Sequence, residues 1–276
     1  MIPDAFLLRL VASSAAGFGV VALVTALADY SGEGPAGFIG GLPWSGPVSL
    51  LAIGFTETSS AAVKALTLFP LGLTAAISFL LFYAFPRKMR FLARMFIALI
   101  LWALASTSVA LWAPDSFGVS AAAGLGVSLL VLYARSRVGT ERINSVRARP
   151  GVWRTVLRGL LGGIVVAVVV IIGAVGGPLT GGVFAGAPVA WSSSLYVTER
   201  SRGLEFSRSL TWEFMKTGVL TVIPYAIAAY YLFPVAGIWL GTLLSYVAIS
   251  PLAYVAWKLI DHAVNEADWS LESKRH

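Results

Sequence analysis

Apolar runs of about 20 residues recur along almost the whole chain, and they constrain its fold more than any other feature. A helix rises about 1.5 Å per residue, so a run of this length can cross the roughly 30 Å of hydrocarbon in a bilayer. Hydrophobic residues make up 58% of the chain and charged residues 12%. The sequence therefore predicts an all-α fold, a polytopic transmembrane helix bundle. We expect about nine spans, near 5–28, 37–56, 61–85, 91–113, 117–134, 155–175, 179–198, 209–233 and 236–260.

One segment interrupted by glycine and proline occurs twice. Residues 34–58 and 177–201 both begin with Gly-Pro, contain a Gly-x-Pro and a Ser-Leu, and reach a Thr-Glu near their ends. In an apolar chain, such a duplication is typical of secondary transporters built from two structural repeats. The first apolar run contains Ala26-Leu27-Ala28, which is similar to a signal-peptide cleavage site. We expect this run to be retained, because the run that precedes the second copy, 155–175, is a full span.

Positive charge indicates how the spans are oriented. With nine spans, Lys and Arg gather in the loops of one side, at 87–90, 135–154 and 200–208. Cytoplasmic loops carry an excess of these residues, so we expect this side to face the cytoplasm in the cell membrane, with the N-terminus outside and the C-terminus inside. The net charge of +7 is explained by this orientation, and we expect no binding of nucleic acid. The tail after Lys258 is expected to be a frayed cytoplasmic end.

The two copies are five spans apart, and an odd offset inverts one copy relative to the other. The predicted arrangement is four spans, one linking span and four inverted spans. The first repeat is residues 1–113. Residues 114–153 contain the linking span and a basic cytoplasmic loop. Residues 154–276 form the inverted repeat with a short cytoplasmic tail.

The glycines and prolines of both copies predict a break in the helix. Proline lacks an N–H and glycine lowers helix propensity by about 1 kcal/mol, so the backbone groups released there must face protein or a cavity. Two such segments that enter from opposite faces would meet near the midplane, where inverted-repeat transporters bind substrate. A second interpretation is that the glycines only permit close helix packing and the prolines only kink the helices. The expected substrate-binding residues are Gly40, Gly41, Pro43, Trp44, Gly186, Pro188, Trp191 and Ser193.

Four charged residues are candidates for ion coupling, because carboxylates within spans often mark ion pathways. Glu57 and Glu199 end the two copies, and the position of Glu57 also fits an interfacial glutamate. Glu213 and Lys216 are spaced i, i+3, so they share a helix face and can neutralise each other. Lys64 and Arg94 lie near span ends, where a long side chain can reach water. Aromatic residues toward span ends, Trp257 among them, are expected to be interfacial anchors.

The inverted-repeat arrangement resembles the drug/metabolite transporter superfamily. In motif the resemblance covers the two 25-residue copies, and in architecture about 200 residues. The extra linking span departs from an eight-span or ten-span pattern. The resemblance implies transport of an unspecified solute and transfers no individual binding residue.

The residue types in the chain favour a transport function over a catalytic one. The chain has no cysteine and only two histidines, His262 and His276, so we expect no metal site and no cofactor, and we expect that the chain is not an enzyme. A channel or a lipid scramblase is an alternative that needs a continuous polar path. A membrane-embedded enzyme or a structural subunit is a second alternative. The expected partners are membrane lipids and a small solute, and a homodimer is compatible with the sequence.

Overall fold

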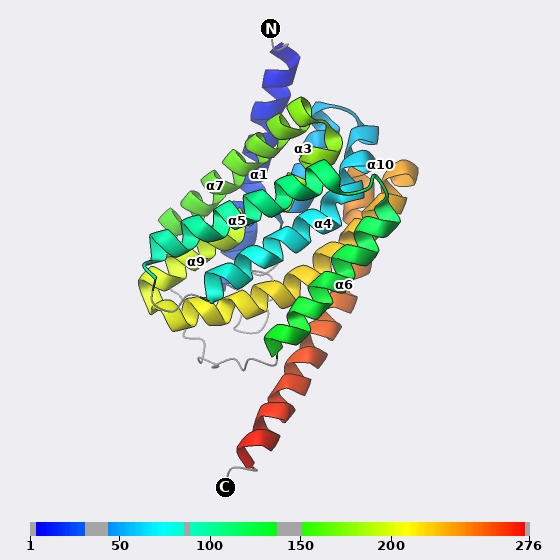
Figure 1. Ribbon diagram of the computed structural model, residues 1–276. Coiled ribbons are helices and arrows are strands. Elements are labelled where there is room, and N and C mark those ends of the chain that lie inside the picture. Colours follow the sequence, from blue (N-terminus) through cyan, green and yellow to red (C-terminus); the bar gives the residue numbers. More distant parts are fainter. Residues whose placement is uncertain (1–3, 31–43, 86–88, 137–150, 274–276) are drawn as a thin grey trace.

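The fold of the described residues is entirely helical. The structure, a computed structural model, describes residues 4–30, 44–85, 89–136 and 151–273, and every element in these ranges is a helix (Figure 1). The helices are α1 (Asp4–Tyr30), α3 (Ser45–Thr56), α4 (Ser59–Ala84), α5 (Phe91–Trp112), α6 (Phe117–Ser136), α7 (Val152–Gly176), α8 (Pro178–Ala185), α9 (Val189–Arg202) and α10 (Leu204–Ser273). The predicted all-α bundle is confirmed.

Six described helices are long and apolar enough to cross a membrane, so the structure does not bear out the expected nine separate spans. In the second copy the difference has a physical cause, a break made by glycine and proline between α8 and α9. The expected span 179–198 is divided into the short helices α8 and α9, and the expected span 37–56 contains the 12-residue helix α3. The part of this span before residue 44 lies outside the described residues.

The two expected spans 209–233 and 236–260 lie on the two limbs of one element, α10. The chain turns inside this element at Gly237, whose φ of 75° lies in the left-handed region that glycine tolerates best. The two limbs, 204–236 and 238–273, then run side by side. The hydroxyl groups of Tyr225 and Thr242 lie 3.4 Å apart, and Trp257 Nε1 donates to Glu213 Oε2 at 3.1 Å. The expected frayed tail is instead helical as far as Ser273.

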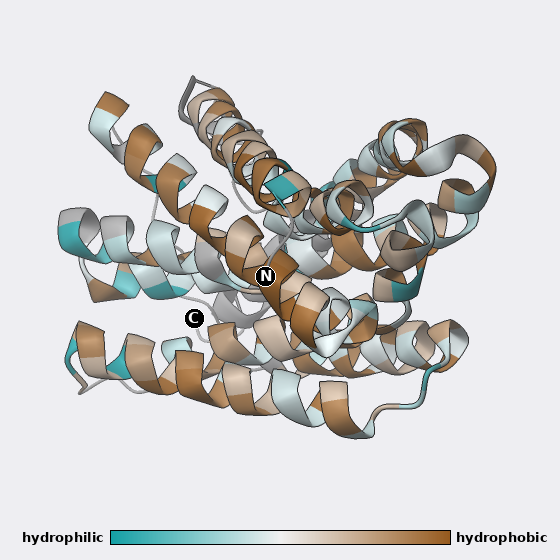
Figure 2. Cartoon of the chain, turned by 90° about the horizontal axis from the view of Figure 1, so that it is seen from above, coloured by the Kyte–Doolittle hydropathy of each residue, from teal (hydrophilic) through white to brown (hydrophobic). Residues whose placement is uncertain are grey.

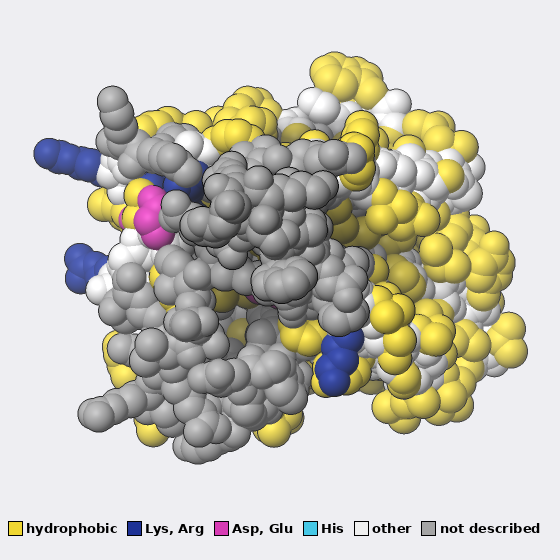
Figure 3. Space-filling model, turned by 90° about the horizontal axis from the view of Figure 1, so that it is seen from below, with side chains coloured by type: hydrophobic (Ala, Val, Ile, Leu, Met, Phe, Trp, Pro, Cys, Tyr) yellow, Lys and Arg dark blue, Asp and Glu magenta, His cyan; other side chains and the backbone are white. Residues whose placement is uncertain are grey.

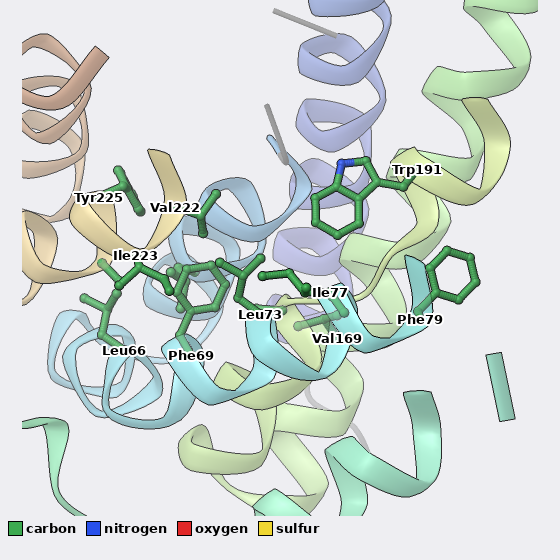
Figure 4. Close-up of a cluster of buried hydrophobic side chains, with 14 of the residues drawn as sticks. Leu66, Phe69, Leu73, Ile77, Phe79, Val169, Trp191, Val222, Ile223 and Tyr225 are labelled. Atoms are coloured by element: carbon green, nitrogen blue, oxygen red, sulfur yellow. The ribbon is translucent and has the colours of Figure 1, made fainter. Parts of the chain in front are cut away.

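Helix α4 is the centre of the bundle. In its most hydrophobic stretch 72% of residues are buried, against 11% in α5. Figure 4 shows Leu66, Phe69, Leu73 and Ile77 of α4 among the buried side chains of its neighbours.

The outer helices turn large apolar side chains outward, which is the pattern of a protein embedded in a membrane. Leu92 and Leu130 are each at least 65% exposed. Hydrophobic residues follow the helices over their whole length (Figure 2), and yellow hydrophobic side chains cover most of the described rim in Figure 3. A soluble protein rarely exposes apolar surface on this scale.

Glycines allow two helix pairs to approach closely. A Cβ added at Gly17 of α1 would lie 2.7 Å from the side chain of Val166 on α7. A Cβ added at Gly182 of α8 would lie only 1.8 Å from the carbonyl oxygen of Ala65 on α4. Small residues of this kind let helix backbones meet in a membrane. Helix α8 is therefore held against the central helix by its glycines.

Candidate functional site

A small, partly open cavity lies where α3 and α9 begin. It has room for about one water-sized molecule. Phe69 and Leu73 of α4, Trp191 of α9 and Val222 of α10 contribute walls, and Figure 4 shows these four side chains directed toward a common region. The remaining lining residues are Ser45, Gly46, Ala185, Gly186, Ala187, Pro188 and Ala190.

The cavity exists because the helix ladder breaks between α8 and α9. Pro188 cannot donate a backbone hydrogen bond, and it precedes the first turn of α9 as the N-cap residue without capping it by a side chain. The ladder resumes when Ser192 N donates to the carbonyl of Pro188 at 2.8 Å. The predicted interruption in the second copy is thus confirmed. The corresponding glycines and proline of the first copy, Gly40, Gly41 and Pro43, lie outside the described residues.

From the cavity, α3 and α9 run to opposite ends of the bundle. Helix α3 ends beside the turn of α10, where a Cβ on Gly54 would lie 2.8 Å from Ile238 and the ring of Phe55 lies 6.3 Å from that of Trp239. We call this the Glu57 end, after the residue that follows α3. Helix α9 ends beside the first turn of α10, because Gly203 and the start of α10 follow it directly. We call this the Glu199 end.

The structure brings together three of the predicted binding residues and adds two residues from the first copy. Gly186, Pro188 and Trp191 line the cavity, as do Ser45 and Gly46, which sequence reasoning did not select. Ser45 and Gly46 directly follow the predicted Gly-x-Pro, so the first copy contributes its next turn to the site.

The other two predicted binding residues in the described ranges do not line the cavity. Trp44 stacks on Tyr246 with ring centroids 4.7 Å apart. Ser193 donates to the carbonyl of Ala190 at 2.9 Å, so its hydroxyl serves its own helix.

Gly186 has a packing role as well as a place in the cavity wall. A Cβ added there would lie 2.7 Å from the backbone of Gly72 on α4. The packing interpretation and the cavity interpretation both apply to this residue. A bulky substitution at Gly186 would therefore separate α8 from α4, and it cannot test the cavity alone.

Glu199 belongs to a buried polar network that joins four helices. Its carboxylate accepts an ion-pair hydrogen bond from Arg94 of α5 and a hydrogen bond from the hydroxyl of Tyr83 on α4. The Ser207 hydroxyl of α10 lies 2.7 Å from that of Tyr83, and the Arg94 guanidinium lies 4.6 Å from the centroid of the Tyr83 ring. The network holds four helices, α4, α5, α9 and α10, together at the Glu199 end.

The prediction that Arg94 reaches water was wrong. Its side chain is 1% exposed, because the carboxylate of Glu199 offers a partner inside the bundle. Sequence reasoning missed Arg94 and Tyr83 as partners, and nothing in the local pattern of either residue signals a contact about 100 residues away. Lys64 is exposed, as expected.

Glu213 and Lys216 form the predicted ion pair, with Glu213 Oε1 and Lys216 Nζ 2.9 Å apart. The Lys216 ammonium is buried between two indole rings, 5.5 Å from the centroids of Trp212 and Trp257. Trp257 also donates to Glu213, so it is buried against the first limb of α10 and is not the interfacial anchor that we expected. This cluster joins the two limbs of α10, and a coupling role for it stays a prediction.

Glu57 differs from both pairs. It lies between α3 and α4 and makes no ion pair within the described residues. Its Oε1 atom is enclosed without a hydrogen-bond partner, and burial raises the pKa of this carboxyl above its usual value of 4.5. Glu57 is therefore a titratable group without an ion-pair partner in the part of the chain that the structure describes.

Comparison with models of protein families, with characterised proteins and with solved structures finds no match for this chain.

Proposed function

We propose that this protein is a secondary transporter that moves a small solute across the membrane by alternating access between two inverted repeats. The observation that carries the proposal is the cavity at which α3 and α9 both begin. Discontinuous helices whose ends meet inside a bundle are the usual substrate site of inverted-repeat transporters. In this state the cavity holds about one water-sized molecule, so the solute needs α3 and α9 to move apart.

The packing of the two halves supports the inverted repeat. In the proposed arrangement α1 corresponds to α7, and α4 to the first limb of α10. The members of each pair pack against each other, as expected for helices related by a two-fold axis that passes between them. The opposite directions of α3 and α9 are also those that inversion requires.

The charge distribution supports the proposed orientation. Arg90, Arg200 and Arg208 lie at the Glu199 end, where Arg208 Nε donates to the carbonyl of Ala84 at 2.6 Å. We propose that this end faces the cytoplasm, because basic residues gather on that side of membrane proteins. The Glu57 end would then face outward, together with the N-terminus.

The lining of the cavity favours transport over catalysis. Ser45 provides the only side-chain hydroxyl among the lining residues, and the others are glycine, proline or apolar. A channel would need a continuous polar path, and in this state the Glu199 network links four helices across the Glu199 end of the bundle.

The experiment uses the absence of native cysteine. An Ala190→Cys variant places one thiol at the cavity, and an Ala123→Cys variant places one on the exposed face of α6 as a control. Each variant is treated with a membrane-impermeant thiol reagent in right-side-out and in inverted vesicles. We expect Cys at 190 to react from both sides and Cys at 123 from neither. A thiol at 190 that reacts from neither side would show that the cavity is only a packing defect, and ionic conductance in planar bilayers would indicate a channel.

A further inference from the structure

We propose that Glu57 binds and releases a proton, and that its counterpart Glu199 is a structural group that joins helices. A role of Glu57 in coupling proton movement to transport rests on the transport function proposed above. Proton binding by Glu57 does not depend on that function. The proposal follows from the contrast between two glutamates that occupy matching places in the two copies.

Glu57 Oε1 is enclosed in the protein and has no hydrogen-bond partner. A Cβ added at Gly173 of α7 would lie 3.6 Å from this oxygen, so the carboxyl group lies close to the end of α7. The Glu57 side chain as a whole is only partly buried, so the carboxyl group is at the border of the interior, where a proton can reach it.

The local electrostatics also disfavour a negative charge on Glu57. The residue is the C-cap of α3, where its N–H donates to the carbonyl of Ile53 at 2.9 Å, and a helix C-terminus carries partial negative charge. From α1, the exposed guanidinium of Arg9 donates to the carbonyl of Phe55 and makes no ion pair with Glu57 within the described residues. From α4, Lys64 is exposed. Helix α8 has no charged residue, and the charged residues of α7 and α10 in the described ranges lie toward the Glu199 end. Burial accordingly raises the pKa of Glu57.

Glu199 has the opposite surroundings. Arg94 and Tyr83 both donate to its carboxylate, so its Oε2 atom is partnered, unlike Glu57 Oε1. A guanidinium in contact with the carboxylate also excludes a metal cation from that site.

A proton fits the Glu57 site better than a metal cation does. Hard cations are bound by about six oxygen ligands, whereas a proton needs a single carboxylate oxygen. The step is the transfer of one proton from water to a Glu57 oxygen, which converts a carboxylate into a neutral carboxylic acid. Loss of the charge lowers the cost of moving the end of α3 into a less polar environment.

Thermal unfolding of the purified full-length chain tests the proposal without a known solute. A carboxyl whose pKa is raised by folding contributes stability that is present below its usual pKa of 4.5 and is lost as the pH rises through the raised pKa. We expect the wild-type melting temperature to fall over that interval. A Glu57→Gln variant should lack this fall, and at pH near 7.5 it should melt about 2–4 °C above the wild type. The control is Asp115→Asn, which removes an exposed carboxylate at the same end and should keep the wild-type pH dependence.

Two outcomes would overturn the proposal. An unchanged pH dependence in Glu57→Gln would show that another group titrates. A wild-type melting temperature that rises with sodium but not with choline, and that loses this response in Glu57→Gln, would assign the site to a metal cation.

A Glu57→Asp variant provides a second measurement if the Gln variant folds poorly. The infrared band of its protonated carboxyl should shift relative to the wild type at acid pH, and an unshifted band would contradict the assignment. Thiol labelling at position 190 tests transport separately, so either idea can fail alone.

Discussion

The two ends of the bundle place a glutamate carboxylate in opposite surroundings. At the Glu199 end, Arg94, Tyr83 and Ser207 come from three helices and hold one carboxylate in a closed network. At the Glu57 end, the matching carboxylate has an enclosed oxygen without a hydrogen-bond partner, close to Gly173 of α7. The two copies of the repeated segment therefore differ in what surrounds them, not in the residue they present. An ion pair links the helices at one end, and the other end contains the carboxyl group for which we propose proton binding.

The largest expected effect is the loss of Arg94. An Arg94→Ala variant would leave Glu199 in the bundle without its cation, and removing one member of a buried pair costs about 3–5 kcal/mol. The midpoint of thermal unfolding in detergent should fall accordingly. Arg90→Ala is the matched control, because Arg90 is exposed one turn before Arg94. Equal melting temperatures for the two variants would contradict a structural role for the Arg94 pair.

A smaller effect is expected when only one hydrogen bond to Glu199 is removed. A Tyr83→Phe variant keeps the buried ring and removes its hydroxyl, which should lower stability by about 1–2 kcal/mol. In the absence of Arg94 the loss should change in size, because both groups act on the same carboxylate. A double-mutant cycle measures this coupling, and strictly additive losses would mean that the network does not act as a unit.

The smallest loss is expected at the Glu57 end, where the contacts are local. The Thr58 hydroxyl caps α4 by accepting from Ala61 N at 3.1 Å, so a Thr58→Ala variant should lose about 1 kcal/mol. The change in melting temperature should be independent of Arg94, since the cap is at the opposite end. A loss as large as that of Arg94→Ala would show that the Glu57 end is cross-linked as firmly as the other.

The sequence predicted local features well and long-range ones poorly. The helix break before Pro188 and the Glu213–Lys216 pair follow from neighbouring residues, and both are present. The turn at Gly237 separates the two limbs of α10, as the two expected spans 209–233 and 236–260 require. The burial of Arg94 could not be predicted, since it depends on a carboxylate that is distant in sequence.

The residues that line the cavity could be predicted from the sequence only in part. Gly186, Pro188 and Trp191 follow from the repeated segment, and they line the cavity. Phe69 and Leu73 do not differ in pattern from other apolar residues of α4, so only packing shows that they form its wall. The roles of Glu57 and Glu199 looked alike in the sequence, and the difference between them arises from helices outside both copies.

Distance measurements between spin labels test the proposed alternating access most directly. One pair, Arg90→Cys with Arg200→Cys, reports on the Glu199 end, and a second, Phe55→Cys with Val175→Cys, reports on the Glu57 end; all four positions are exposed. We predict two distances for each pair in lipid. A Glu199→Gln substitution should increase the longer distance population at the Glu199 end and the shorter one at the Glu57 end. A single distance for each pair, unchanged by this substitution, would contradict alternating access.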